Sequence, residues 1–125
     1  MNIEKHIQYW FKGAEEDLEV AEKLVKDGKM RHGLFFAHLS LEKILKANVV
    51  KTLQKIPPKI HNLLRLADLA DLELSDEQKV FLRQFDLYQL EGRYPDSMDF
   101  QISSDSAEMK LQEARKFKKW IMEKL

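Results

Sequence analysis

The chain has 125 residues with 21 basic and 21 acidic side chains, so its formal net charge at pH 7 is zero. This length supports a single domain over residues 1–125, and four glycines and three prolines are too few for a turn-rich β-sandwich or barrel. The absence of cysteine excludes a disulfide scaffold and a Cys-ligated zinc site and fits a cytoplasmic setting. We expect no signal peptide and no membrane association, because no basic leader and no stretch of about 20 apolar residues is visible.

The first predicted helix runs from about Asn2, a good N-cap residue, to Asp27, and Gly28 offers its C-terminal stop. Its apolar residues recur at spacings of three and four, which is the helical period. They are Ile3, Ile7, Phe11, Ala14, Leu18, Ala21 and Val25. This pattern predicts a helix with one buried stripe.

The second predicted helix begins near Met30 and closes at Pro57-Pro58, because neither proline donates a backbone hydrogen bond. It is apolar over most of its circumference, which is typical of a helix packed on more than one side. We therefore expect it to be the central helix of the fold.

Glu42, Lys43 and Lys46 put three charges into the middle of this apolar helix. Glu42 and Lys46 stand in the favourable i,i+4 order, so a structural ion pair explains them best. His38 lies one turn before Glu42, and such a pair could bind metal or move protons. An ordinary pair on the helix surface is the favoured interpretation of His38 and Glu42.

The remaining chain predicts a short helix from about His61 to Ala70 and another that starts at the Ser75/Gln78 capping box. The second of these ends or kinks between Gly92 and Pro95, and residues 96–104 form a loop. Its apolar surface comes from Val80, Phe81, Phe85, Leu87 and Tyr88. Ser104 or Asp105 then caps a last helix. Together these elements predict an all-α, up-and-down bundle of four to five helices.

Most other polar clusters have simple structural explanations. The acidic run Glu15-Glu16-Asp17 is predicted to be a solvated helix face, and the basic residues from Arg115 to Lys119 suit the end of a helix. Phe35, Phe36, Phe81 and Phe85 are predicted to be core residues. Arg93 is different, because an arginine at a helix end beside Tyr94 is well placed to bind an anion.

The order of motifs resembles a known family. The matching residues are Tyr9-Trp10, Ala14, Asp17-Leu18, Ala21, Leu24, Gly28, Phe35-Phe36-Ala37, Leu41-Glu42-Lys43, Lys46-Ala47, Pro57 or Pro58, His61-Asn62-Leu63, Tyr88 and Arg93-Tyr94-Pro95. This pattern is similar to the HEPN domain, a small prokaryotic helical domain often encoded next to a minimal nucleotidyltransferase. The likeness spans roughly Ile3 to Ile121.

The resemblance implies a helical bundle that forms a homodimer and is linked to nucleotide binding. Many members are metal-independent ribonucleases of toxin–antitoxin or defence systems, with an Arg-x4–6-His motif near the last helices. Arg93 takes the arginine position, but residues 98–100 are Met98, Asp99 and Phe100, so the histidine is missing. Arg31 and His38 satisfy the spacing literally in the second helix, where the family does not place the motif, and we interpret that match as a coincidence.

The resulting hypothesis is a catalytically degenerate HEPN protein that binds nucleotide or RNA and works with a nucleotidyltransferase partner. Its expected binding residues are Arg93, Tyr94, Glu42 and Lys46, which meet across a homodimer, with no catalytic residue, metal or cofactor. One alternative is a metal-independent RNase that uses Arg93 with Asp99 or His61 as the base. A second alternative is a structural dimerisation module.

Overall fold

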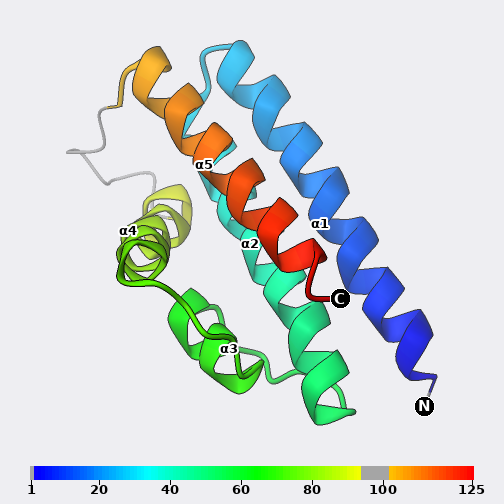
Figure 1. Ribbon diagram of the computed structural model, residues 1–125. Coiled ribbons are helices and arrows are strands. Elements are labelled where there is room, and N and C mark those ends of the chain that lie inside the picture. The colour runs from blue at the N-terminus through cyan, green and yellow to red at the C-terminus, as the bar shows by residue number, and fades with distance from the viewer. Residues whose placement is uncertain (1, 94–101) are drawn as a thin grey trace.

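The computed structural model describes residues 2–93 and 102–125 and contains five helices. These are α1 (Ile3–Lys26), α2 (Met30–Leu53), α3 (Leu63–Leu69), α4 (Asp76–Arg93) and α5 (Ser104–Met122), shown in Figure 1. The described parts of the chain contain no strand, so the predicted all-α bundle is confirmed. Within those parts no helix combines the length and apolar content needed to cross a membrane.

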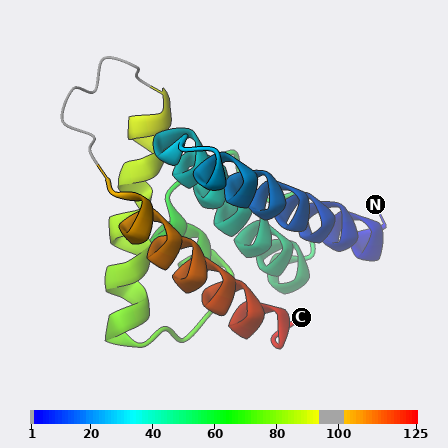
Figure 2. The same cartoon turned by 90° about the horizontal axis from the view of Figure 1, so that it is seen from above.

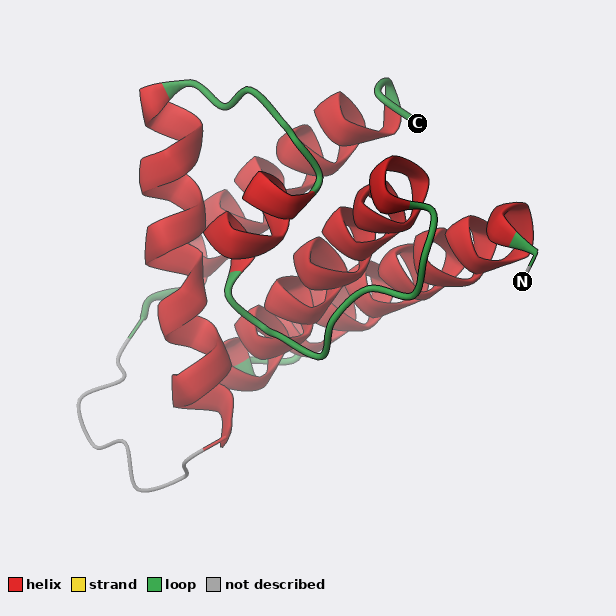
Figure 3. Cartoon of the chain, turned by 90° about the horizontal axis from the view of Figure 1, so that it is seen from below, coloured by secondary structure: helices red, strands yellow, loops and turns green. Residues whose placement is uncertain are grey.

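The helix α2 is the centre of the fold, because it packs against each of the other four helices. It forms an antiparallel hairpin with α1, and α5 packs against both (Figure 1). Figure 2 shows that α4 crosses this layer steeply. The short α3 lies beside α2, because the connecting loop 54–62 runs back along α2 before α3 begins (Figure 3). The predicted central position of the second helix is therefore confirmed.

The helix ends follow local capping chemistry. Asn2 caps α1 by accepting a hydrogen bond from the backbone N–H of Lys5, and Gly28 follows that helix with a φ of 82°. The Ser75/Gln78 capping box before α4 is confirmed, with hydrogen bonds of 2.9 and 3.1 Å in the two directions.

Three predicted boundaries are wrong by a few residues. The α3 helix begins at Leu63, because the side chain of Asn62 accepts the hydrogen bond of a helical N–H and caps it there. Ser103 caps α5, one residue before Ser104 and two before Asp105, the two predicted caps. The α2 helix ends at Leu53, ahead of the prolines, where Gln54 turns into the left-handed region. Of the predicted loop 96–104, residues 96–101 lie outside the described residues.

The apolar stripe of α1 packs against α2 as predicted. The buried members are Ile7, Ala14, Leu18, Ala21 and Val25. On α4 the prediction assigned too many residues to the apolar surface that packs against the fold. Phe85 is buried, but Val80 and Leu87 are 46% and 59% exposed. The expectation of a wholly solvated acidic run in α1 is also wrong, since Asp17 forms an ion pair of 2.7 Å with Lys43.

Candidate functional site

A buried polar network occupies the middle of α2. His38 is fully buried, and the side chains of Glu42 and Lys46 are only 6% and 7% exposed. The Nζ of Lys46 donates to Oε2 of Glu42 at 2.9 Å, which confirms the predicted i,i+4 pair. The prediction that His38 and Glu42 form a surface pair is wrong. The loop before α3 and the steeply crossing α4 cover this face of α2, which helical periodicity alone does not reveal.

The network ties four segments together. His61, in the loop before α3, donates from Nδ1 to Oε1 of Glu42 at 3.1 Å. His38 donates from Nε2 to a carboxylate oxygen of Asp86 in α4 at 2.9 Å. The carboxylate of Asp86 also accepts from the backbone N–H of Leu63 at 3.2 and 3.3 Å. Because each partner comes from a different segment, the network fixes how α3 and α4 sit against α2.

The two histidines of this network differ in what they can do. His38 has no exposed surface, and its Nδ1 lies 3.9 Å from Glu42 without a hydrogen-bond partner among the described residues. It cannot reach a substrate, which supports the interpretation of the Arg31/His38 spacing as a coincidence. The side chain of His61 is 46% exposed, and Glu42 holds its Nδ1. A carboxylate-oriented, half-exposed imidazole is suited to proton transfer.

Metal binding has no geometric support here. Among the described residues no group of three or more histidines, aspartates and glutamates is arranged to hold a metal ion. The ammonium of Lys46 occupies one side of Glu42 and also lies 5.3 Å from the ring centroid of Trp10.

The four residues predicted for the binding site do not all fall within the described residues. Glu42 and Lys46 are adjacent and paired with each other. Arg93 is the last residue of α4, but its side chain and all of Tyr94 lie outside the described residues. The approach of Arg93 to Glu42 and Lys46 across a dimer therefore stays a prediction.

A second site, missed in the sequence analysis, is a groove at the turn between α1 and α2. It has a volume of about 680 Å³, and three basic side chains line it, while none of its described lining residues is acidic. We call it the basic groove, and it is formed by Gly28, Lys29, Met30, Arg31, His32, Ile102 and Ser103. Lys29 and His32 are exposed and Arg31 is half-buried.

The basic groove has a signal in the sequence. Lys29, Arg31 and His32 gather at the start of α2, where the partial positive charge of a helix disfavours cations. The first turn of α2 contains no acidic residue, and Lys29 forms no side-chain cap. Residues that lower the stability of their own helix are often present because the function of the protein needs them.

Arg115 of α5 is different, because its charge is paired within the fold. The guanidinium of Arg115 lies 2.6 Å from Glu22 of α1 and 3.6 Å from Glu108. The hydrogen bond with Glu22 is the main reason why the pKa of Arg115 is raised above its ordinary value. Arg115 therefore has a structural role through this ion pair with α1, and of the predicted cluster only Lys119 lies in the last turn of α5.

Comparison with known proteins agrees with this geometry. The model of the HEPN domain family matches residues 7–125. The crystal structure of TT1696 from Thermus thermophilus superposes with a TM-score of 0.82 at 25% identity, and the match covers 100% of both chains. No curated protein matches the chain. Because the family model spans nearly all of the sequence, the chain belongs to the HEPN domain family.

Proposed function

We propose that this HEPN protein binds the phosphate groups of a nucleotide or RNA in the basic groove and does not cleave the ligand. The observation that carries the proposal is the charge of the groove. Three basic side chains meet there without an acidic residue among the described lining, in a protein whose net charge is zero. Lys29 and His32 are exposed there, whereas Arg115 of α5 is paired with Glu22.

The groove suits a phosphate in both charge and size. Arginine and lysine form charge-assisted hydrogen bonds with phosphate oxygens, and arginine can do so with two N–H groups at once. The volume of about 680 Å³ falls within the range of about 300 to 1,000 Å³ that is usual for small-ligand sites. A mononucleotide or one segment of a single strand therefore fits.

The four residues predicted from the sequence to bind nucleotide or RNA have different roles in this proposal. Glu42 and Lys46 neutralise each other and support the fold beneath the surface. Arg93 and Tyr94 add a second phosphate contact in a homodimer, in which two arginines approach one bridging phosphate. A nucleotidyltransferase is the proposed protein partner, on the strength of the family relationship.

A titration of fluorescently labelled single-stranded RNA and of ATP tests the proposal. Lys29→Ala and His32→Ala should each weaken binding, and Lys119→Ala, an exposed lysine of α5, is the matched control that should not. Binding should also weaken with salt, and the slope should fall by about 0.7 for each phosphate contact removed from a single strand. Arg93→Ala tests the dimer contact separately. Unchanged affinity of Lys29→Ala and His32→Ala for RNA and ATP would show that the basic groove is not the binding site.

One observation favours a second candidate function, metal-independent RNA cleavage. His61 is half-exposed and is oriented by the buried Glu42, which is the arrangement of a general base. Cleavage of RNA in the presence of a metal chelator, abolished by His61→Ala, would support this candidate. Intact RNA after prolonged incubation with the wild-type protein would reject it. If the protein neither binds nor cleaves RNA or nucleotide, its function is better explained as a structural dimerisation module.

A further inference from the structure

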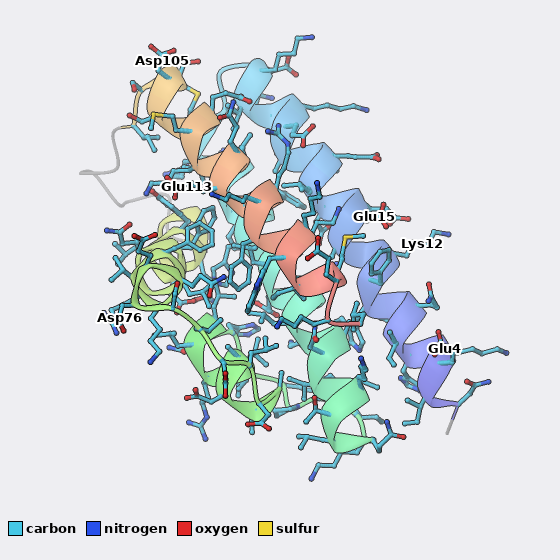
Figure 4. All side chains as sticks on the ribbon, viewed as in Figure 1. Glu4, Lys12, Glu15, Asp76, Asp105 and Glu113 are labelled. Carbon is cyan, nitrogen blue, oxygen red and sulfur yellow. The ribbon has the colours of Figure 1, made fainter. Side chains whose placement is uncertain are left out.

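A groove near the N-terminal end of α1, opposite to the end that carries the basic groove, combines aromatic surface with positive charge. Its volume is about 360 Å³. We call it the Tyr9 groove, and it is lined by Lys5, His6, Tyr9, Trp10 and Ile56. The first four residues belong to α1, and Ile56 belongs to the loop after α2. Figure 4 shows Glu4 and Lys12, on either side of this stretch of α1 in the sequence, projecting outward from the helix.

The ring of Tyr9 is supported from below and open to solvent. Tyr9 is 70% exposed, more than any other large hydrophobic side chain that the structure describes. Its ring meets the half-buried ring of Trp10 edge to face, with 5.2 Å between the centroids. Trp10 is held in turn by the buried Lys46, whose Nζ lies 5.3 Å from the centroid of its ring. An exposed ring on a fixed support is a surface on which a nucleobase stacks.

The charge of the groove favours a phosphate beside that base. Lys5 is exposed and His6 is half-buried, and none of the described lining residues is acidic. Glu4 is the acidic residue of the first turn of α1, and its Oε1 accepts a hydrogen bond from Gln8 outside the groove. Lysine forms charge-assisted hydrogen bonds with phosphate oxygens. An open ring next to cations is the combination that binds single-stranded nucleic acid.

We propose that the Tyr9 groove stacks one base of a single-stranded RNA whose phosphates are held in the basic groove. This inference rests on the proposed function, because one stacked base binds weakly alone and attachment at the basic groove raises the local concentration of the strand. The two grooves lie about 25 Å apart along α1. The acidic residues Glu15, Glu16 and Glu19 stand between them, so the strand contacts the two ends of α1 and not its middle. Only a strand that reaches both grooves gains from Tyr9.

Fluorescence anisotropy with labelled single-stranded RNA of two lengths tests the proposal. A strand of about four nucleotides occupies the basic groove alone, and a strand of about 16 nucleotides reaches both grooves. Tyr9→Leu should weaken binding of the long strand by about five- to a hundredfold, the usual effect of losing one stacked base, and should leave binding of the short strand unchanged. Tyr9→Phe keeps the ring and should bind both strands as the wild type does. Equal affinity of the wild type and Tyr9→Leu for the long strand would overturn the proposal.

Lys29→Ala separates this result from a failure of the proposed function. If the basic groove holds phosphate, Lys29→Ala weakens binding of both strands, whatever the result for Tyr9→Leu. If Lys29→Ala binds both strands as the wild type does, the proposed function fails and the attachment that the Tyr9 groove needs fails with it. Circular dichroism checks that the variants fold, which is expected of Tyr9→Leu because Tyr9 is mostly exposed.

Tryptophan fluorescence reports on the Tyr9 groove directly. The chain has two tryptophans, so Trp120→Phe leaves Trp10, which lines the groove, as the only one. The long strand should quench its emission, and an abasic strand of the same length, with the same phosphates and no bases, should not. Unchanged emission at saturation with the long strand would contradict stacking in this groove. A response to phosphatidylserine vesicles and not to RNA would assign the groove to a lipid surface and overturn the proposal.

Discussion

The first turn of α2 and the middle of the same helix use charge in opposite ways. In the middle, Glu42 and Lys46 are buried and paired, and His61 adds a second partner for the carboxylate. At the start of the helix, the N-cap residue Lys29 and His32 in the first turn are exposed on a groove whose described lining contains no acidic residue. Charges that satisfy one another hold the fold together, whereas the exposed basic side chains of Lys29 and His32 are available to a ligand.

This difference separates stability from binding along one helix. A buried ion pair contributes little net stability when complete, but removing one partner leaves an uncompensated buried charge. An exposed cation can be removed with a small change in stability, usually within about 0.5 kcal/mol. Substitutions in the middle of α2 should therefore destabilise the protein, and substitutions at its start should change what the protein binds.

The largest expected effect is that of Glu42→Gln. The change removes the carboxylate that both Lys46 and His61 contact, and it leaves the ammonium of Lys46 buried without its counter-ion. We expect a loss of about 3 to 5 kcal/mol in the free energy of unfolding, measured by urea denaturation. Glu16→Gln makes the same chemical change at an exposed position of α1 and should cost little. Equal stability of the two variants would show that the buried pair is not what holds this region.

A smaller effect is expected from Gly33→Ala, between the two regions. A Cβ at this position would lie 2.5 Å from a methyl group of Val25 and 3.0 Å from the carbonyl oxygen of Ala21. The two helices would have to separate, at a cost of about 1 to 3 kcal/mol. Thermal unfolding measures this cost, and Gly33→Ala should leave the charges of the basic groove in place. Wild-type stability would mean that α1 and α2 can move apart without loss.

The smallest effect concerns Tyr88 and appears only at alkaline pH. Burial and the charge of Glu113 raise its pKa above the ordinary value of 10.0. The folded chain therefore holds this proton more tightly than the unfolded chain, so the contribution to stability is complete below pH 10.0 and is lost as the pH rises above it. Urea denaturation on both sides of this pH should show a smaller alkaline loss for Tyr88→Phe than for the wild type. Tyr9→Phe, at a residue that is 70% exposed, is the control and should follow the wild type. Parallel losses in Tyr88→Phe and the wild type would contradict the effect of burial.

The fold could largely be predicted from the sequence because its signals are local. The stripe that contains Ala14, Leu18 and Ala21 keeps the helical period and packs as its spacing indicates. Capping residues and Gly28 place most helix ends within two residues. The steep crossing of α4 could not be predicted, since it depends on contacts such as that of Asp86 with His38, which are 48 residues apart.

The candidate site was predictable only in part. The i,i+4 spacing of Glu42 and Lys46 predicted their pairing, but their burial and the approach of His61 depend on the loop that runs back along α2. Lys29, Arg31 and His32 are clustered in the sequence, yet the groove exists only because the start of α5 packs beside this turn. Helical period and spacing do not encode such packing between distant segments.

The most direct test of phosphate binding in the basic groove is a map of backbone amide NMR shifts during titration with a short single-stranded RNA. We predict shift changes that saturate and concentrate at residues 28–33 and 102–103, with Lys29→Ala reducing them while its unfolding free energy stays close to that of the wild type. Changes confined to other parts of the chain, or no changes at all, would contradict the proposed function.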